Sequence, residues 1–149
     1  MTLPNRRIEA LEQSYGELLA LCDALEAVAD SLPHTINART CTKLSDAAEP
    51  VIARVHRVEE EALFPLLATS QKPQLSRTLA RLREEHLTDH SVAAEVSEAL
   101  HGLGTGQSKL SADAVGYLLR SFFESMRRHV QGVHELIAMV PPVRNGDKL

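Results

Sequence analysis

Apolar side chains recur at intervals of three and four residues along four stretches of the chain, which glycine and proline separate. Such spacing places the side chains on one face of an α-helix. The pattern predicts helices over residues 5–31, 37–68, 73–101 and 111–140, and nowhere does it show the alternation of a β-strand. In the first stretch the recurring positions are Ile8, Leu11, Tyr15, Leu18, Cys22 and Leu25.

The predicted helices are about 25 to 30 residues long and would each span about 40 Å. Short connections favour antiparallel neighbours, so the pattern predicts an all-α, up-down-up-down antiparallel four-helix bundle. We expect one domain over residues 1–149, with a core at about 5–140 and a C-terminal tail at 141–149 that begins with two prolines. Pro65 predicts a kink near the end of the second helix.

The amino-acid composition favours one cellular compartment and argues against membranes and nucleic acid as partners. The 149 residues carry a net charge of −4 and 44% hydrophobic residues, as is ordinary for a soluble globular domain. No apolar run approaches the roughly 20 residues that cross a bilayer, so we expect no membrane partner. The two cysteines form no CxxC pair, which favours the cytoplasm. The mild acidity gives no reason to expect nucleic acid.

Histidine is the residue type that demands an explanation, because seven occur in a chain with few aromatic residues. Five of them fall inside the second, third and fourth predicted helices. Residues four apart on a helix lie on one face, and two pairs have that spacing. These pairs are His56 with Glu60 and His86 with His90. On the fourth predicted helix, His134 follows His129 by five residues.

One histidine on an apolar face is usually a core histidine with a hydrogen bond, but comparable arrangements on three successive helices are harder to explain in that way. Desolvating several imidazoles and a carboxylate is costly without a partner, and a bound metal would repay that cost. Imidazole with carboxylate oxygen suits iron, with manganese or zinc as less favoured occupants. The ligands are too many for one tetrahedral ion, so two ions bridged by Glu60 fit better.

The motifs resemble those of hemerythrin-like (HHE cation-binding) domains. The stretch from His56 through Glu60 to Phe64-Pro65 is similar to the family's H-x-x-E-E-x-x-L-F-P sequence. The segments 83–90 and 122–129 resemble the family's third-helix H-x3-H motif and the approach to its fourth-helix histidine. The resemblance covers essentially the whole chain. It implies a four-helix bundle around two iron ions, Fe2+ or Fe3+, joined by an oxo or hydroxo bridge.

The resemblance also implies roles for individual residues. His86, His90 and His129 would hold one iron, His56 would hold the other, and Glu60 would bridge them. A small diatomic molecule or a peroxide would be the ligand of the centre. Glu59 and Glu61, the neighbours of Glu60, are expected at the surface or as groups that orient a ligand imidazole.

Two positions depart from the family pattern. The first helix normally supplies a histidine but contains none here, and Tyr15 lies on its buried stripe. Tyr15 is either a phenolate ligand or a packed tyrosine whose hydroxyl is hydrogen-bonded. His134 stands where hemerythrins proper carry a bridging aspartate. It is either a terminal ligand or a boundary histidine beside the site.

These departures favour binding or sensing of dioxygen, nitric oxide or peroxide, or iron handling, over reversible oxygen transport. A weak peroxidase, catalase-like or oxidase activity would fit the same centre. The missing first-helix histidine favours an alternative from another class, a metal-poor bundle that serves as a protein-interaction module. A phosphotransfer bundle is disfavoured because it needs an exposed histidine, and the buried stripe around Cys22 argues against a cysteine nucleophile.

Overall fold

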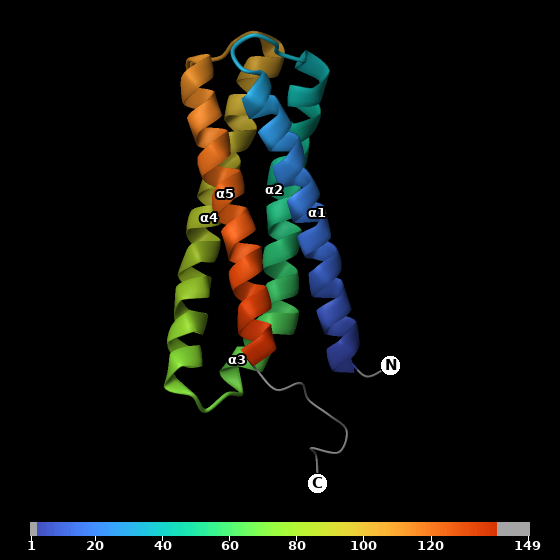
Figure 1. The fold of residues 1–149 in the computed structure, drawn as a ribbon, viewed down its shortest axis with the longest axis vertical. Coiled ribbons are helices and arrows are strands. Elements are labelled where there is room, and N and C mark those ends of the chain that lie inside the picture. The colour runs from blue at the N-terminus through green and yellow to red at the C-terminus, as the bar shows by residue number, and fades with distance from the viewer. Residues whose placement is uncertain (1–2, 140–149) are drawn as a thin grey trace.

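Four long helical segments run up and down the molecule, which confirms the predicted all-α four-helix bundle (Figure 1). The computed structural model describes residues 3–139, so Val140, the two prolines and the tail at 141–149 lie outside the described residues. Within this range all regular structure is helical. The elements are α1 (Leu3–Ser31), α2 (Ala38–Val58), a π-helical turn η1 (Glu59–Leu63), α3 (Phe64–Ala68), α4 (Pro73–Thr105) and α5 (Ala112–Met139).

Side-chain caps fix where two of the helices begin. The Asn37 side chain accepts a hydrogen bond from the Thr40 amide at 2.9 Å, at the start of α2. The Ser111 hydroxyl accepts one from the Ala114 amide at 3.1 Å, at the start of α5. Each cap satisfies a backbone donor that the first helical turn leaves free. The second cap agrees with the predicted start of the fourth helix at residue 111.

The third predicted helix is longer than expected, because α4 continues through the glycine-rich stretch to Thr105. It ends at Gly106, whose φ of 72° is left-handed backbone that glycine adopts without steric cost. Gly104 allows α4 to approach α2 closely. A Cβ atom at this position would lie 2.6 Å from Thr42 Oγ1 and 3.1 Å from the Ala38 carbonyl oxygen, so a larger residue would require the Thr42 side chain to move and the α2 backbone to shift slightly.

The second predicted helix is interrupted, and Pro65 explains why. Proline has no amide hydrogen to donate to the carbonyl four residues earlier. Just before the proline, the Phe64 amide donates to the Glu59 carbonyl, five residues back, which closes a π turn. The expected kink is therefore a π turn immediately before the proline, and it begins at Glu59.

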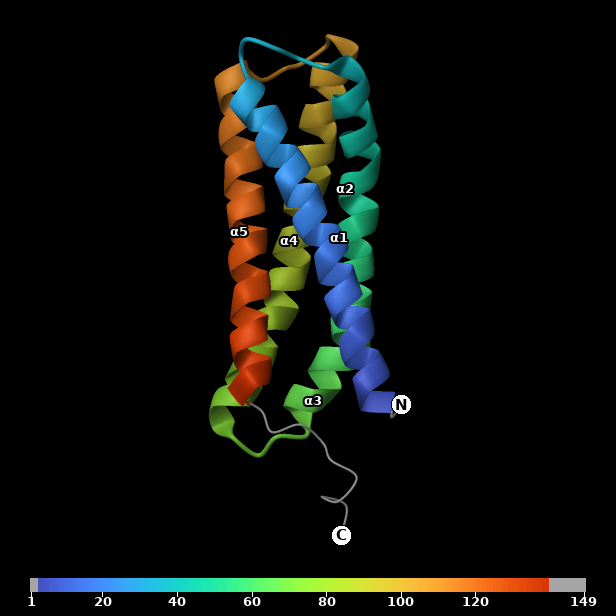
Figure 2. The ribbon, with the colours of Figure 1, turned by 45° about the vertical axis from the view of Figure 1, so that its right-hand side comes forward.

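The helices contact one another around a square, with α1 and α4 each packed against α2 and α5 (Figure 2). Apolar side chains from all four long helices fill the interior. Among the helices of residues 3–139, none is both long and apolar enough to span a membrane. The fully buried residues include Leu18 and Cys22 on α1, Ala48 and Ile52 on α2, Val96 and Leu100 on α4, and Leu119 on α5.

Candidate functional site

The carboxylate of Glu59 lies in the middle of the bundle, fully buried from solvent. Val55, Glu59, Leu63 and Leu67 are all buried and follow one another at four-residue steps. In an α-helix each such step drifts about 40° around the axis. The π turn winds less per residue and counters this drift. The π turn therefore keeps Leu63 and Leu67 on the interior stripe that Val55 and Glu59 begin.

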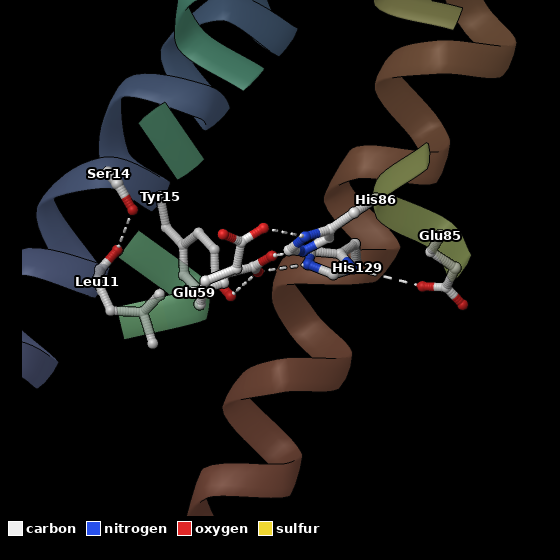
Figure 3. A network of polar contacts seen from close by, with 8 residues as sticks. Leu11, Ser14, Tyr15, Glu59, Glu85, His86 and His129 are labelled. Atoms are coloured by element: carbon white, nitrogen blue, oxygen red, sulfur yellow. Dashed lines mark hydrogen bonds and ion pairs between the residues drawn. The ribbon is translucent and has the colours of Figure 1, made fainter. Parts of the chain in front are cut away.

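Three side chains from three other helices converge on this carboxylate (Figure 3). The Tyr15 hydroxyl on α1 donates a hydrogen bond to Oε2. His86 Nε2 on α4 lies 2.7 Å from Oε1, and His129 Nε2 on α5 lies 2.6 Å from Oε2. All three side chains are buried or nearly so. Glu59 thus joins all four helical segments through one interior group.

The network fixes the charges of its members. Burial alone would raise the pKa of Glu59, but hydrogen bonds from His129, His86 and Tyr15 lower it to about 2. Burial opposes the charged form of His129, yet the hydrogen bond and charge of Glu59 raise its pKa above the usual value. Burial, followed by the Glu59 charge, raises the pKa of Tyr15. The interior therefore holds a carboxylate and a neutral phenol.

A further imidazole, that of His56, stacks on His86 with ring centroids 3.9 Å apart and planes 10° apart. Phe64 also stacks on the His86 ring, at 4.9 Å. Burial, followed by the charge of the neighbouring His86, lowers the pKa of His56 to about 4. His56 is therefore a neutral imidazole at neutral pH, and a neutral imidazole is the form that binds metals.

Each imidazole that faces Glu59 also has a carboxylate on its outer side. His86 Nδ1 lies 3.5 Å from Glu60 Oε1, and His129 Nδ1 lies 3.7 Å from Glu85 Oε1. A carboxylate on one ring nitrogen favours a proton there and leaves the other nitrogen free to act as a ligand. Both outer separations exceed those of the Glu59 contacts, so Glu60 and Glu85 act on the imidazoles as nearby charges rather than as hydrogen-bond partners.

Three of the predicted site residues lie outside this cluster. Glu60, predicted as the bridging carboxylate, has a side chain that is 59% exposed, and the neighbouring Glu59 occupies the interior position. His90 was expected on the buried face but is exposed. His134 is also exposed, and its Nε2 lies 2.7 Å from Glu12 Oε1 at the surface. Of the predicted site residues, the structure brings four together: Tyr15, His56, His86 and His129.

Two carboxyl groups that were not predicted as site residues, the buried Glu59 and the half-buried Asp89, share a signal in the heptad spacing. Glu59 follows the buried Ile52 by seven residues. Asp89 lies seven residues from both Leu82 and Val96, which are buried on α4. Residues seven apart recur on one helix face. The i,i+4 spacing from a histidine pointed to Glu60 and His90 instead, each about 100° around the helix from the carboxyl residue that precedes it.

Comparison with known proteins assigns the chain to a family. The sequence model described as the hemerythrin HHE cation binding domain matches residues 6–139. The chain belongs to the hemerythrin HHE cation-binding family. No curated protein and no solved structure matches the chain significantly. Membership in this family indicates a metal-binding helical protein, and the matched range contains every residue of the buried cluster.

The donor set of this hemerythrin-family domain fits a metal cation, although the side chains are arranged to bond with one another. Nowhere in residues 3–139 do three or more His, Cys, Asp or Glu side chains stand ready to hold an ion. The reason is visible at Glu59, whose oxygens accept from the imidazole nitrogens that would themselves be ligands. Imidazole, carboxylate and phenol oxygen together suit iron, manganese or zinc.

Proposed function

We propose that the buried cluster holds a pair of iron ions and that the protein binds or senses dioxygen, nitric oxide or peroxide. Tyr15, His56, Glu59, His86 and His129 are the proposed ligands, with Glu59 replacing Glu60 as the bridging group. The single observation that carries this proposal is the fully buried carboxylate faced by two imidazole nitrogens from separate helices. Iron bound there would supply redox chemistry toward such small molecules.

The charge of Glu59 is the main contribution of the chain. A buried carboxylate without a cation is costly. In the structure His129 offsets this cost, because its raised pKa favours the protonated, positively charged imidazole. A metal cation would take the place of those shared protons. The pKa of Glu59, lowered to about 2, keeps the carboxylate charged at neutral pH. Metal binding is then expected to release protons.

The surroundings orient the imidazoles and exclude water. Glu60 and Glu85 place negative charge 3.5 and 3.7 Å from the outer nitrogens of His86 and His129. Phe64 covers one face of the His86 ring. Leu11, four residues before Tyr15, and Leu63, four residues after Glu59, are fully buried. Such support fixes ligand geometry before a metal arrives, which reduces the cost of ordering the site.

Two matched pairs of variants test the proposal by metal analysis after expression in iron-containing medium. Glu59→Gln keeps the shape of the side chain and removes its charge, and Glu60→Gln is its exposed neighbour. His86→Ala removes a buried imidazole, and His90→Ala removes an exposed one. We expect iron in the parent and in the two exposed variants, with little in Glu59→Gln or His86→Ala. Equal loss in Glu60→Gln would return the bridging role to Glu60.

A second candidate function is a metal-poor bundle that serves as a protein-interaction module. The observation in its favour is that the network is complete by itself. Within the described part of the chain, every buried side-chain nitrogen and oxygen has a hydrogen-bond partner. A purified parent protein that retains no transition metal, even after anaerobic incubation with ferrous iron, would favour this candidate over the di-iron proposal.

A further inference from the structure

A cleft of about 530 Å³ lies between α4 and α5 and reaches the imidazole of His129. Its walls come from both helices over the same stretch that carries the cluster. His129 therefore has two sides, since its Nε2 contacts the buried Glu59 and its ring also lines the cleft. Glu85, which faces His129 Nδ1, lines the same cleft. One side chain separates the interior carboxylate from this opening.

The lining of this cleft is polar and apolar in about equal parts, with Leu82, Met126, Val133 and Leu136 as its apolar residues. We call it the polar cleft after its charged side chains. Glu84, Glu85 and Asp89 supply three carboxylates, and Arg81 and Arg128 supply two guanidinium groups. Side-chain hydroxyl groups add neutral hydrogen-bonding partners. Carboxylates next to His129 disfavour small anions, whereas donors and acceptors of both kinds suit a small neutral molecule that hydrogen-bonds. The hydroxyl groups belong to Thr78, Thr88 and Ser125.

A second cleft, of about 550 Å³, approaches the cluster from the opposite flank of α4 and reaches His86. Phe64, Pro65, Ala68 and Leu87 make most of its wall, so it is largely apolar. The His86 ring in this cleft is stacked on Phe64, which covers one of its faces. The two openings thus differ in chemistry, and each offers a separate approach to one imidazole of the network.

We propose that the polar cleft between α4 and α5 is the entry port for small neutral hydrogen-bonding molecules, of which hydrogen peroxide is the probe. The proposal rests on the proposed function for the identity of the reacting centre. The cleft itself is formed by side chains of α4 and α5, so its existence does not depend on a bound metal. It ends at His129, so a molecule in the cleft meets the imidazole before it meets Glu59.

Gly132 offers a way to close the port without disturbing the fold. It lines the cleft one helical turn after His129, and a Cβ built there meets no atom within 4 Å. Gly132→Leu would place an apolar side chain across the opening. Leucine also favours helix over glycine, so we expect the variant to fold. Gly16→Leu is the matched control, because Gly16 is exposed on α1 and its Cβ also meets nothing.

The first measurement needs no metal. Metal-free protein is treated with diethyl pyrocarbonate, a small neutral reagent that acylates imidazole, and the modification rate of His129 is followed by peptide mass spectrometry. We expect Gly132→Leu to slow it about tenfold, because entry then requires a local opening of the helices. Gly16→Leu and Ala68→Leu, which fills the apolar cleft, should match the parent. An unchanged rate in Gly132→Leu would overturn the port.

The second measurement uses iron-loaded protein and follows the rate at which hydrogen peroxide changes its visible spectrum. The same variants should rank in the same order. If Ala68→Leu slows the reaction with hydrogen peroxide and Gly132→Leu does not, entry is assigned to the apolar cleft and the proposal is overturned. If the parent binds no iron, the di-iron function fails, and the acylation rates still decide whether the cleft admits molecules to His129.

Discussion

The two halves of the bundle fill equivalent interior positions with different chemistry. In the half next to the connections at residues 32–37 and 106–111, here the loop half, the interior is apolar. In the half next to η1, here the π half, Tyr15, Glu59, His86 and His129 occupy the interior. Tyr15 and Cys22 show the change on one helix, because they are seven residues apart and both fully buried. The loop half includes Cys22, Leu25, Val96, Leu100 and Leu119.

Polar contacts between helices occur in both halves but differ in kind. In the loop half Ser45 Oγ donates to the Ser97 carbonyl at 2.7 Å, and Ser97 Oγ donates to the Ser45 carbonyl at 2.6 Å. This pair is neutral, complete and joins two helices. In the π half a single charged group, Glu59, joins four segments. The bundle therefore joins its helices through a neutral pair in one half and through a charged interior group in the other.

The largest expected effect on stability separates packing from ligand binding. Leu100→Ala removes a fully buried side chain from the loop half and should lower the free energy of unfolding by about 3 to 5 kcal/mol. Urea titration measures this loss, and the loss should be the same with and without iron. A Leu100→Ala protein whose deficit disappears on adding iron would show that the two halves are not separate.

Iron should stabilise the protein through the π half alone. At a free iron concentration one hundred times the dissociation constant, the free energy of unfolding should rise by about 2.7 kcal/mol. Leu100→Ala should keep this increase, and Glu59→Gln should lose it while remaining folded. Thermal melts of the three proteins at matched iron concentration measure the effect. An increase that survives Glu59→Gln would place the metal elsewhere.

The fold was predictable from the sequence because each helix has one long apolar stripe. The stripe on α1 through Leu11, Leu18 and Leu25 is buried as expected, as is Cys22. The predicted helix boundaries agree closely with the structure except in the second predicted helix, which η1 interrupts, and at the end of α4, which continues to Thr105 through Gly104, where α2 approaches closely. That close approach is a tertiary contact, and local sequence spacing contains no sign of it.

The site was less predictable, because small rotations around a helix decide which residue faces inward. Tyr15, His86 and His129 lie on apolar stripes and were found by that pattern. Glu60 was preferred over Glu59 because it stands four residues after His56, although Glu59 follows the buried Ile52 by seven residues. The two spacings compete, and the side chains from the other helices that face Glu59 are tertiary contacts that the sequence does not show.

Tyr15→Phe sharpens the comparison at the level of one hydroxyl group. The variant removes one donor to Glu59, so the metal-free protein should lose about 1 kcal/mol of stability. Tyr117→Phe is the matched control, since Tyr117 is 78% exposed and should lose nothing measurable. In iron-loaded protein a Tyr15 phenolate ligand would give a visible absorption band. A band that persists in Tyr15→Phe would show that Tyr15 serves only as a packed hydrogen-bond donor.

The smallest expected effect lies at Cys22, the loop-half counterpart of Tyr15 on the same stripe. Burial raises the pKa of the Cys22 thiol to about 11 from an ordinary value near 9. At pH 8 the thiol is neutral in the folded and unfolded chains, so it contributes no pH dependence. Between pH 9 and 11 the unfolded chain loses this proton first, and stability falls as the pH rises. At pH 10 the loss should be about 1 kcal/mol.

Urea titrations of the parent and Cys22→Ala at pH 8 and pH 10 isolate this contribution. Ionisation of Cys41 and of the tyrosines in the unfolded chain affects both proteins equally, so only the difference between their slopes belongs to Cys22. We expect the parent to lose more stability than Cys22→Ala over this range. Equal losses would mean that the thiol ionises as readily in the folded protein as in the unfolded chain. The interior of the loop half would then admit charge, and its contrast with the π half would rest on side-chain identity alone.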